Sequence, residues 1–146
     1  ALVFAINRAL GNVGATVRYI DPVEAQPQEQ TASLARLCEE IDAGGVDVLL
    51  ILGGNPVYDA PVDLRFRERL EKVPLRVHLS LYEDETSRLC HWHVPETHYL
   101  ESWSDVRAFD GTATIQQPLI APLYDGKSVH EVLAAFSDQP ARTSYE

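Results

Sequence analysis

The stretch that decides the fold runs from Asp47 to Pro61 and reads Asp-Val-Leu-Leu-Ile-Leu-Gly-Gly-Asn-Pro-Val-Tyr-Asp-Ala-Pro. Its apolar run, Val48 to Leu52, is uninterrupted, which is typical of a strand buried on both faces of a parallel sheet. Gly53-Gly54 can adopt backbone angles that end a strand, and the proline of Asn55-Pro56 forces the asparagine into an extended conformation. The stretch therefore predicts a central strand followed by a short loop with free backbone amides.

The loop after this strand is the first candidate binding site. In open α/β sheets, ligands collect outside the carboxyl ends of the strands, where the strand order switches. Any pocket beside this strand should therefore involve Gly53, Gly54 and Asn55. The alternative is that Gly-Gly-Asn-Pro is only a tight exit turn, because glycine and proline commonly mark turns. The residues by themselves leave both interpretations open.

Helical and strand patterns alternate along the rest of the chain. The apolar spacing predicts helices over residues 1–10, 31–43, 62–73, 83–90 and 128–136, and strands over 15–20, 75–81 and 112–115. Thr31 or Ser33 can cap the second helix, and Ser128 with Glu131 forms a capping box at the last one. A strand, a helix and a further strand form a crossover unit. The pattern predicts a three-layer α/β domain with a mainly parallel sheet.

Length and charge restrict the class of protein. The chain of 146 residues is expected to form a single domain over residues 1–146. Its formal net charge of -10 makes nucleic acid an unfavourable partner, because such binding depends on clustered lysine and arginine. No run reaches the roughly 18 apolar residues that a membrane span requires, so no direct membrane insertion is expected. We expect no signal peptide and a soluble chain.

The cysteines and the missing methionine are also informative. Cys38 and Cys90 are far apart and form no Cys-x-x-Cys pair, so neither an iron-sulfur cluster nor a zinc knuckle is expected. The chain contains no methionine and begins inside a helical pattern, which indicates a fragment of a larger polypeptide. The polar end, residues 137–146, is expected to be disordered.

A group of histidines and glutamates is the main candidate for a metal site. It comprises His91, His93, Glu96, His98 and Glu101. Two histidines separated by one residue would point to the same side of a strand, as metal ligands can. Aromatic residues interleave with the group, however, and the spacing is not that of a known zinc motif. We therefore predict no metal site and expect these imidazoles to bond backbone groups.

No catalytic residue is predicted. The chain has no Gly-x-Ser-x-Gly elbow and no Gly-x-x-x-x-Gly-Lys phosphate loop. His78 and His130 are interpreted as polar residues of a strand and a helix. The acidic run from Glu83 to Glu85 could form a paired-carboxylate site, but consecutive residues of a first helical turn point in different directions. It is interpreted as the cap of a helix.

Four further stretches resemble one known family. They are Leu-Gly-Gly-Asn-Pro-Val at 52–57, Leu-Tyr-Glu-Asp-Glu-Thr at 81–86, Val-Pro-Glu-Thr-His-Tyr-Leu-Glu at 94–101 and Asp-Gly-Thr-Ala-Thr-Ile-Gln-Gln-Pro-Leu-Ile at 110–120. The chain resembles the Rossmann-like third domain of the large subunit of molybdopterin oxidoreductases of the dimethyl sulfoxide reductase family. Ala-Ile-Asn-Arg-Ala-Leu-Gly-Asn-Val-Gly at 5–14 and Cys-His-Trp-His-Val-Pro at 90–95 resemble the molybdopterin-oxidoreductase-like iron-sulfur subunit of alternative complex III.

The resemblance implies a cofactor-binding role for one loop. In catalytic members this domain helps to hold the guanosine of bis-molybdopterin guanine dinucleotide, and Gly53, Gly54 and Asn55 match the loop that contributes. This chain departs from the family at Ser80, where the family commonly has an Asp that can bond the nucleotide. It departs again at Cys90-His91 and at Gly111-Thr112. These departures imply that the loop is a vestige of a cofactor site.

The resemblance leads to one functional hypothesis and two alternatives. The first is a scaffold domain of a respiratory quinol-oxidising complex that has lost the cofactor and packs against iron-sulfur domains and partner subunits. It would lie at the extracytoplasmic face of the bacterial inner membrane. The second is a cofactor-binding domain of an active molybdenum oxidoreductase, and the third is a stand-alone nucleotide-binding α/β module. Since Asp59 and Asp63 follow the loop and would repel phosphate, we expect little or no binding of guanosine nucleotides.

Overall fold

The structure is a computed structural model that describes residues 2–24 and 26–146. The chain divides into two compact units. One comprises residues 1–27 and 105–114, and the other comprises residues 28–104 and 115–146. The second unit contains the predicted strand and its loop.

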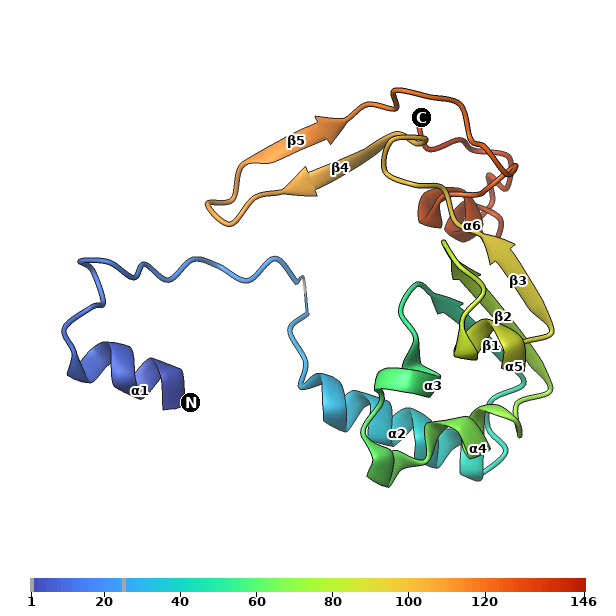
Figure 1. Cartoon of the computed structure of the whole chain (residues 1–146), viewed down its shortest axis with the longest axis horizontal. Coiled ribbons are helices and arrows are strands. Elements are labelled where there is room, and N and C mark those ends of the chain that lie inside the picture. Colours follow the sequence, from blue (N-terminus) through green and yellow to red (C-terminus); the bar gives the residue numbers. More distant parts are fainter. Residues whose placement is uncertain (1, 25) are drawn as a thin grey trace. The chain divides into compact units, whose positions relative to one another are not determined.

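A parallel sheet of three strands lies at the centre of the second unit (Figure 1). It consists of β1 (Val48–Leu52), β2 (Leu75–Ser80) and β3 (Trp92–Pro95), in the order β1-β2-β3. Leu52 pairs with Leu79, and Ser80 pairs with Pro95. The carboxyl ends of all three strands therefore meet at one edge of the sheet. An α/β fold is confirmed, and β1 and β2 occupy the stretches of sequence in which strands were predicted.

One long helix precedes these strands, and short helices connect them. The preceding helix is α2 (Gln30–Asp42), and the connecting helices are α3 (Pro56–Asp59), the 3-10 helix η1 (Val62–Leu64), α4 (Phe66–Leu70) and α5 (Glu85–Leu89). Glu29, rather than Thr31 or Ser33, caps α2, since its carboxylate accepts from the amides of Thr31 and Ala32. The helix predicted over 62–73 is divided because Arg65 adopts a left-handed conformation, with φ of 42°.

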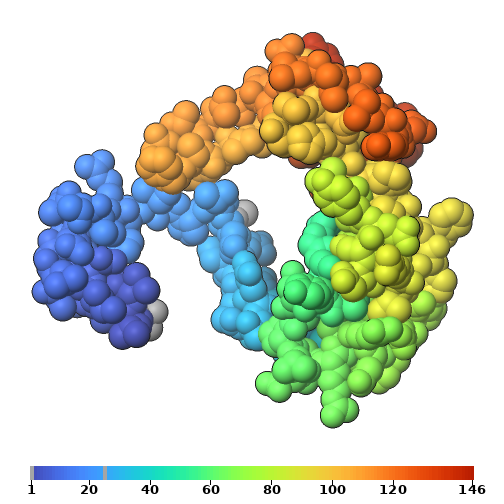
Figure 2. Space-filling view, viewed as in Figure 1, coloured from blue at the N-terminus to red at the C-terminus, as the bar shows by residue number. Residues whose placement is uncertain are grey.

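The core of the second unit lies between the sheet and its helices. Cys38 of α2 and Phe66 and Leu70 of α4 are buried together, and Leu49 and Ile51 of β1 pack against them. Figure 1 shows α2 and α4 side by side. α3 packs against α4, and both helices lie in the green part of the surface in Figure 2. Because side chains alternate along a strand, Leu49 and Ile51 face these helices while Val48 and Leu50 point to the opposite face.

The predicted central position of β1 is wrong for the part of the chain that the structure describes. The strand pairs only with β2 there and forms an edge of the sheet, and Val48 and Leu52 are 55% and 38% exposed. β2 is the central strand, and its residues from His78 to Ser80 are buried. An apolar run indicates that a strand is suited to burial, but it cannot decide which of two neighbours has partners on both sides.

The carboxyl-terminal part of the second unit contains α6 (Val129–Ala134). Its predicted capping box is confirmed, because Ser128 accepts from the amide of Glu131 while the Glu131 carboxylate accepts from the amide of Ser128. Trp103 packs against Tyr145 with ring centroids 5.1 Å apart. A hairpin of β4 (Ser104–Arg107) and β5 (Ala113–Gln116) forms a second sheet, and its residues 105–114 belong to the first unit. β5 corresponds to the strand predicted at 112–115.

The first unit contains α1 (Leu2–Ala9), which agrees with the predicted helix. Phe4 of this helix packs against Tyr19, with ring centroids 5.4 Å apart. The strand predicted over 15–20 is wrong, since the structure has only an isolated bridge between Val13 and Val17. The carbonyl of Asn12 accepts hydrogen bonds from three consecutive amides of residues 15–17, which holds the segment in a tight turn. Of the helices in residues 2–24 and 26–146, none could span a membrane.

Candidate functional site

The loop that follows β1 leaves the carboxyl edge of the sheet through two glycines in left-handed conformations. Gly53 and Gly54 have φ values of 70° and 71°, which only glycine adopts without strain. The Gly53 amide donates to the carbonyl of Leu79 at 2.7 Å and extends the β1-β2 ladder by one step. A Cβ added to either glycine would meet no atom within 4 Å, so packing does not explain these glycines. Their role in this structure is conformational.

Asn55 is held by α5 through both polar atoms of its side chain. Its Nδ2 donates to Glu85 Oε2 at 2.7 Å, and its Oδ1 accepts from the Thr86 hydroxyl at 2.7 Å. Thr86 is fully buried, and its Oγ1 also accepts from the Val57 amide at 3.1 Å. The carbonyl of Asn55 accepts from the amides of Tyr58 and Asp59. These bonds attach the loop to α5 and fix the beginning of α3.

His78 supports the same loop from inside the domain. It is fully buried, its Nε2 lies 3.0 Å from the Gly54 carbonyl, and its Nδ1 lies 2.9 Å from Ser87 Oγ. Because a carbonyl can only accept, Nε2 donates to Gly54, and the Ser87 hydroxyl, which also lies 3.1 Å from Asp84 Oδ1, links the other ring nitrogen to that carboxylate. Asp84 Oδ1 lies 3.5 Å from Nδ1 and accepts from the Ser87 amide at 2.8 Å, so it also caps α5 as predicted.

Ser80 extends this polar network to β3. Its Oγ donates to the Tyr82 carbonyl at 2.8 Å and lies 3.1 Å from His93 Nε2. The same imidazole nitrogen lies 3.1 Å from the Ser80 carbonyl and therefore carries a proton. Ser80 is 6% exposed, so its hydroxyl is used inside the domain. The network links the three strands where they end.

The charge at the loop is negative. The hydrogen bond from Asn55 lowers the pKa of Glu85, an exposed carboxylate that is ionised at neutral pH. Asp84 lies in the same turn, and Glu83 precedes it. Asp59 ends α3 and Asp63 lies in η1. The carboxylate bonded to the loop therefore comes from α5, whereas the sequence pointed to aspartates that follow the loop.

The histidine group predicted as a metal candidate is distributed over separate hydrogen bonds. His91 Nδ1 accepts from the Arg76 amide at 3.1 Å, and His98 Nδ1 accepts from the Leu100 amide at 3.3 Å. Glu101 accepts from the amides of His98 and Leu123. Within residues 2–24 and 26–146, no three potential ligands lie close enough to hold a metal ion. The expected absence of metal in the purified chain stays a prediction.

Burial affects further titratable groups of the second unit. It raises the pKa of Glu96, which follows β3, while the nearby His78 lowers that pKa to a smaller extent. Burial also raises the pKa of both thiols, Cys38 and Cys90, against smaller opposing effects of Arg69 and Arg76. Neither cysteine has the lowered pKa of a reactive thiol. These groups give no indication of acid-base or nucleophilic chemistry.

The sequence pattern indicated the loop but not the residues that hold it. Gly53, Gly54, Asn55 and Ser80 meet at the carboxyl edge as expected from parallel strands. The contributions of His78, Glu85, Thr86 and Ser87 were missed because apolar periodicity says nothing about a polar side chain that is buried. The usable signal was the acidic run from Glu83 to Glu85, which marks the beginning of α5 directly after β2 and so places Thr86 and Ser87 near the carboxyl edge of the sheet. Two cavities that the structure contains lie elsewhere, on residues of β1, β2, α6 and 139–146.

Comparison with known proteins gives low-identity similarities, and no family model matches the chain. The menaquinone reductase molybdopterin-binding-like subunit of Nitratidesulfovibrio vulgaris is 33% identical over 91 residues, which cover 60% of this chain and 13% of that protein. The NADPH-Fe(3+) oxidoreductase subunit alpha of Geobacter sulfurreducens is 26% identical over 107 residues, which cover 73% of this chain and 13% of that protein.

The chain therefore matches about 13% of the length of these relatives. Both relatives are named as subunits, so both belong to larger assemblies. At this level of identity the similarities support a molybdopterin oxidoreductase-like class and do not select one member of it. The chain is similar to one region of oxidoreductase subunits that include a molybdopterin-binding-like protein.

Proposed function

We propose that this chain is a scaffold domain of a molybdopterin oxidoreductase-like subunit, in a quinol-oxidising respiratory complex related to alternative complex III. In this proposal the domain has a three-layer Rossmann-like fold, has lost the cofactor, and packs against iron-sulfur domains and partner subunits at the extracytoplasmic face of the inner membrane. The observation that carries the proposal is the side chain of Asn55, whose two polar atoms are both bonded inside the domain.

The contacts of the loop do not fit a guanosine dinucleotide. A nucleotide needs hydrogen-bond donors and a site that tolerates its phosphate charge. Here the side-chain amide of Asn55 donates to the carboxylate of Glu85, and the backbone amide of Gly53 donates to the carbonyl of Leu79. The ionised Glu85 would lie beside the phosphates and repel them. Ser80 provides a buried hydroxyl where a nucleotide-bonding carboxylate would be expected, and that hydroxyl donates to Tyr82.

Exposed apolar side chains of the second unit support a role in packing. Tyr58, Tyr82 and Trp92 are 77%, 79% and 67% exposed, and they belong to α3, the turn after β2, and β3. Exposed aromatic side chains are enriched where one protein surface contacts another. Domains of the same polypeptide and partner subunits are the proposed neighbours, since the chain matches only 13% of its relatives.

Calorimetric titration of the 146-residue chain with GDP tests the proposal. The Glu85→Gln variant, which removes the charge beside the loop, is titrated in parallel. The scaffold role predicts weak or undetectable binding in both proteins. A dissociation constant in the low micromolar range for the natural chain, weakened by Asn55→Ala, would refute it and favour a bis-molybdopterin guanine dinucleotide-binding domain. Tight binding that appears only in Glu85→Gln would also contradict it, because the loop would then be a complete site suppressed by one charge.

A further inference from the structure

The outer edge of β1 carries backbone groups that pair with no other strand in the part of the chain that the structure describes. The Asp47 carbonyl and the Gly53 amide both bond backbone groups of β2, at 3.0 Å and 2.7 Å. Because backbone groups alternate in direction along a strand, every second residue between these two also bonds β2. The amides and carbonyls of Val48, Leu50 and Leu52 therefore point away from β2, toward the open edge.

The sequence of β1 lacks the features that protect edge strands. Natural sheets protect their edges with charged residues, with proline, with bulges or with a covering segment. The residues of β1 are all valine, leucine or isoleucine, and the first and last of them, Val48 and Leu52, are 55% and 38% exposed. An apolar edge strand of this kind is suited to pairing with a further strand.

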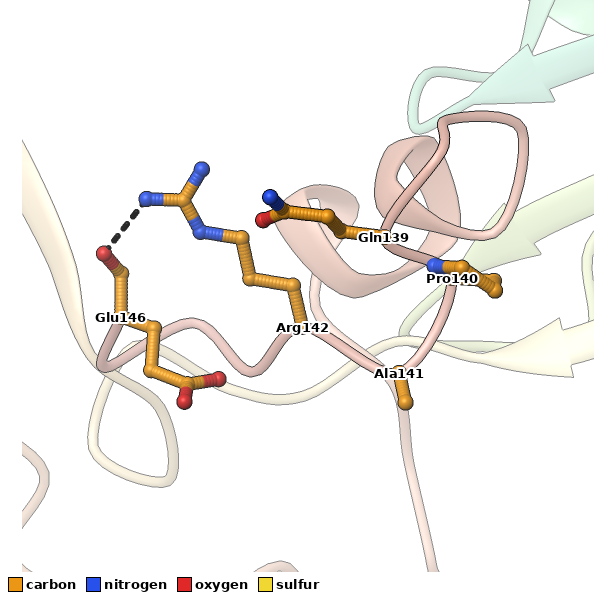
Figure 3. A pocket seen from close by; sticks show the side chains of 5 residues that line it. All are labelled: Gln139, Pro140, Ala141, Arg142 and Glu146. Carbon is orange, nitrogen blue, oxygen red and sulfur yellow. Dashed lines mark hydrogen bonds between the residues drawn. The ribbon is translucent and has the colours of Figure 1, made fainter.

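The segment that follows α6 lies near β1 but does not pair with it. Its residues 140–142 line a cavity together with residues of β1 and β2. The Arg142 amide donates to the Gln139 carbonyl at 3.0 Å, and the Arg142 side chain donates to the Glu146 carbonyl at 2.6 Å (Figure 3). These groups bond within the segment, and β1 pairs with β2 alone among the described residues.

We propose that the open edge of β1 pairs with the same edge of a second copy of this chain, in antiparallel orientation about a twofold axis at Leu50. Leu50 then lies opposite Leu50 of the second copy, and Val48 lies opposite Leu52 of the second copy. Each of these pairs exchanges two hydrogen bonds, so the backbone groups that point away from β2 all gain partners. Such a contact uses the same surface of both copies, as twofold dimers do.

The side chains and charges of β1 fit a second copy of itself. β2, β3, β4 and β5 each contain polar residues, whereas β1 is apolar throughout. Antiparallel pairing therefore places apolar side chains beside apolar side chains on both faces of the joined sheet. Asp47 lies opposite Gly53 of the second copy, so no like charges oppose each other along the strands. The inference is independent of the scaffold role, because it uses the backbone of β1 and not the contacts of Asn55.

Sedimentation velocity of the 146-residue chain over the micromolar range tests the proposal, at about 0.15 M salt to screen the repulsion between two chains of net charge -10. A dimer is expected whose share grows with concentration. Leu50→Pro removes the amide at the centre of the open edge and leaves the bonds to β2 in place, so it should weaken dimerisation by about tenfold or more, the value of two hydrogen bonds. Leu50→Ala is the matched control, because it shortens the same side chain, keeps the amide and should retain the dimer.

A second pair of variants tests the register. Leu50→Lys and Leu50→Glu should each be monomeric, since like charges would face each other across the twofold axis, and an equimolar mixture should restore the dimer. A natural chain that stays monomeric over the whole range would overturn the proposal, as would Leu50→Pro dimerising as tightly as Leu50→Ala. If circular dichroism shows that Leu50→Pro is unfolded, the mixture decides, and association no tighter than that of either charged variant alone would refute the pairing.

Discussion

Replacing Asn55 by alanine separates a structural role of this side chain from a ligand-binding role. The substitution removes the acceptor of the Thr86 hydroxyl, a bond of 2.7 Å, and Thr86 is fully buried. A buried hydroxyl that loses its partner costs about 1–3 kcal/mol. The second bond, to Glu85, is exposed and adds little. We expect Asn55→Ala to lower the free energy of unfolding by about 1–3 kcal/mol and to leave the chain folded, since domains have about 5–15 kcal/mol of stability.

Urea unfolding followed by circular dichroism measures this loss, and a double-mutant cycle assigns it. Thr86→Val removes the other partner of the same bond, together with the contact to the Val57 amide. If the bond stabilises the loop, the two substitutions should be non-additive by about 0.5–3 kcal/mol. A change within about 0.5 kcal/mol for Asn55→Ala, the usual range for a surface substitution, would refute the structural role. Additive effects would show that the two side chains act separately.

Two further predictions concern the sheet and its carboxyl edge. Leu79→Ala should destabilise the fold by about 2–5 kcal/mol because Leu79 is fully buried, whereas Ile51→Ala should cost roughly 1–2 kcal/mol because Ile51 is half-buried; equal losses in urea unfolding would contradict the edge position of β1. Burial raises the pKa of Glu96, so its stabilising contribution is present below the unfolded pKa and is lost as the pH rises through the folded pKa. Glu96→Gln should therefore increase stability at pH 7 relative to the natural chain and have little effect at about pH 4, near the unfolded pKa; an effect independent of pH would contradict this.

Local patterns predicted the elements whose signals are contained in a few neighbouring residues. The run from Val48 to Leu52, the alternation that begins at Leu75 and the capping box at Ser128 all identified elements that the structure contains. The strand predicted over 15–20 failed because the Asn12 carbonyl binds three amides and forms a turn. The helix predicted over 62–73 is divided into η1 and α4, because apolar spacing does not reveal a left-handed residue at Arg65.

The sequence by itself determined an α/β chain, a strand at 48–52 and a glycine loop at its end, because these follow from apolar runs and backbone preferences of single residues. Only the tertiary structure decided that β2 is central and that His78, Thr86 and Glu85 hold the loop. Strand order depends on which strands pair, and Asn55 meets its partners 30 and 31 residues further along the chain. Hydrogen bonds over such separations form only when the crossover brings α5 to the loop, so no local pattern encodes them.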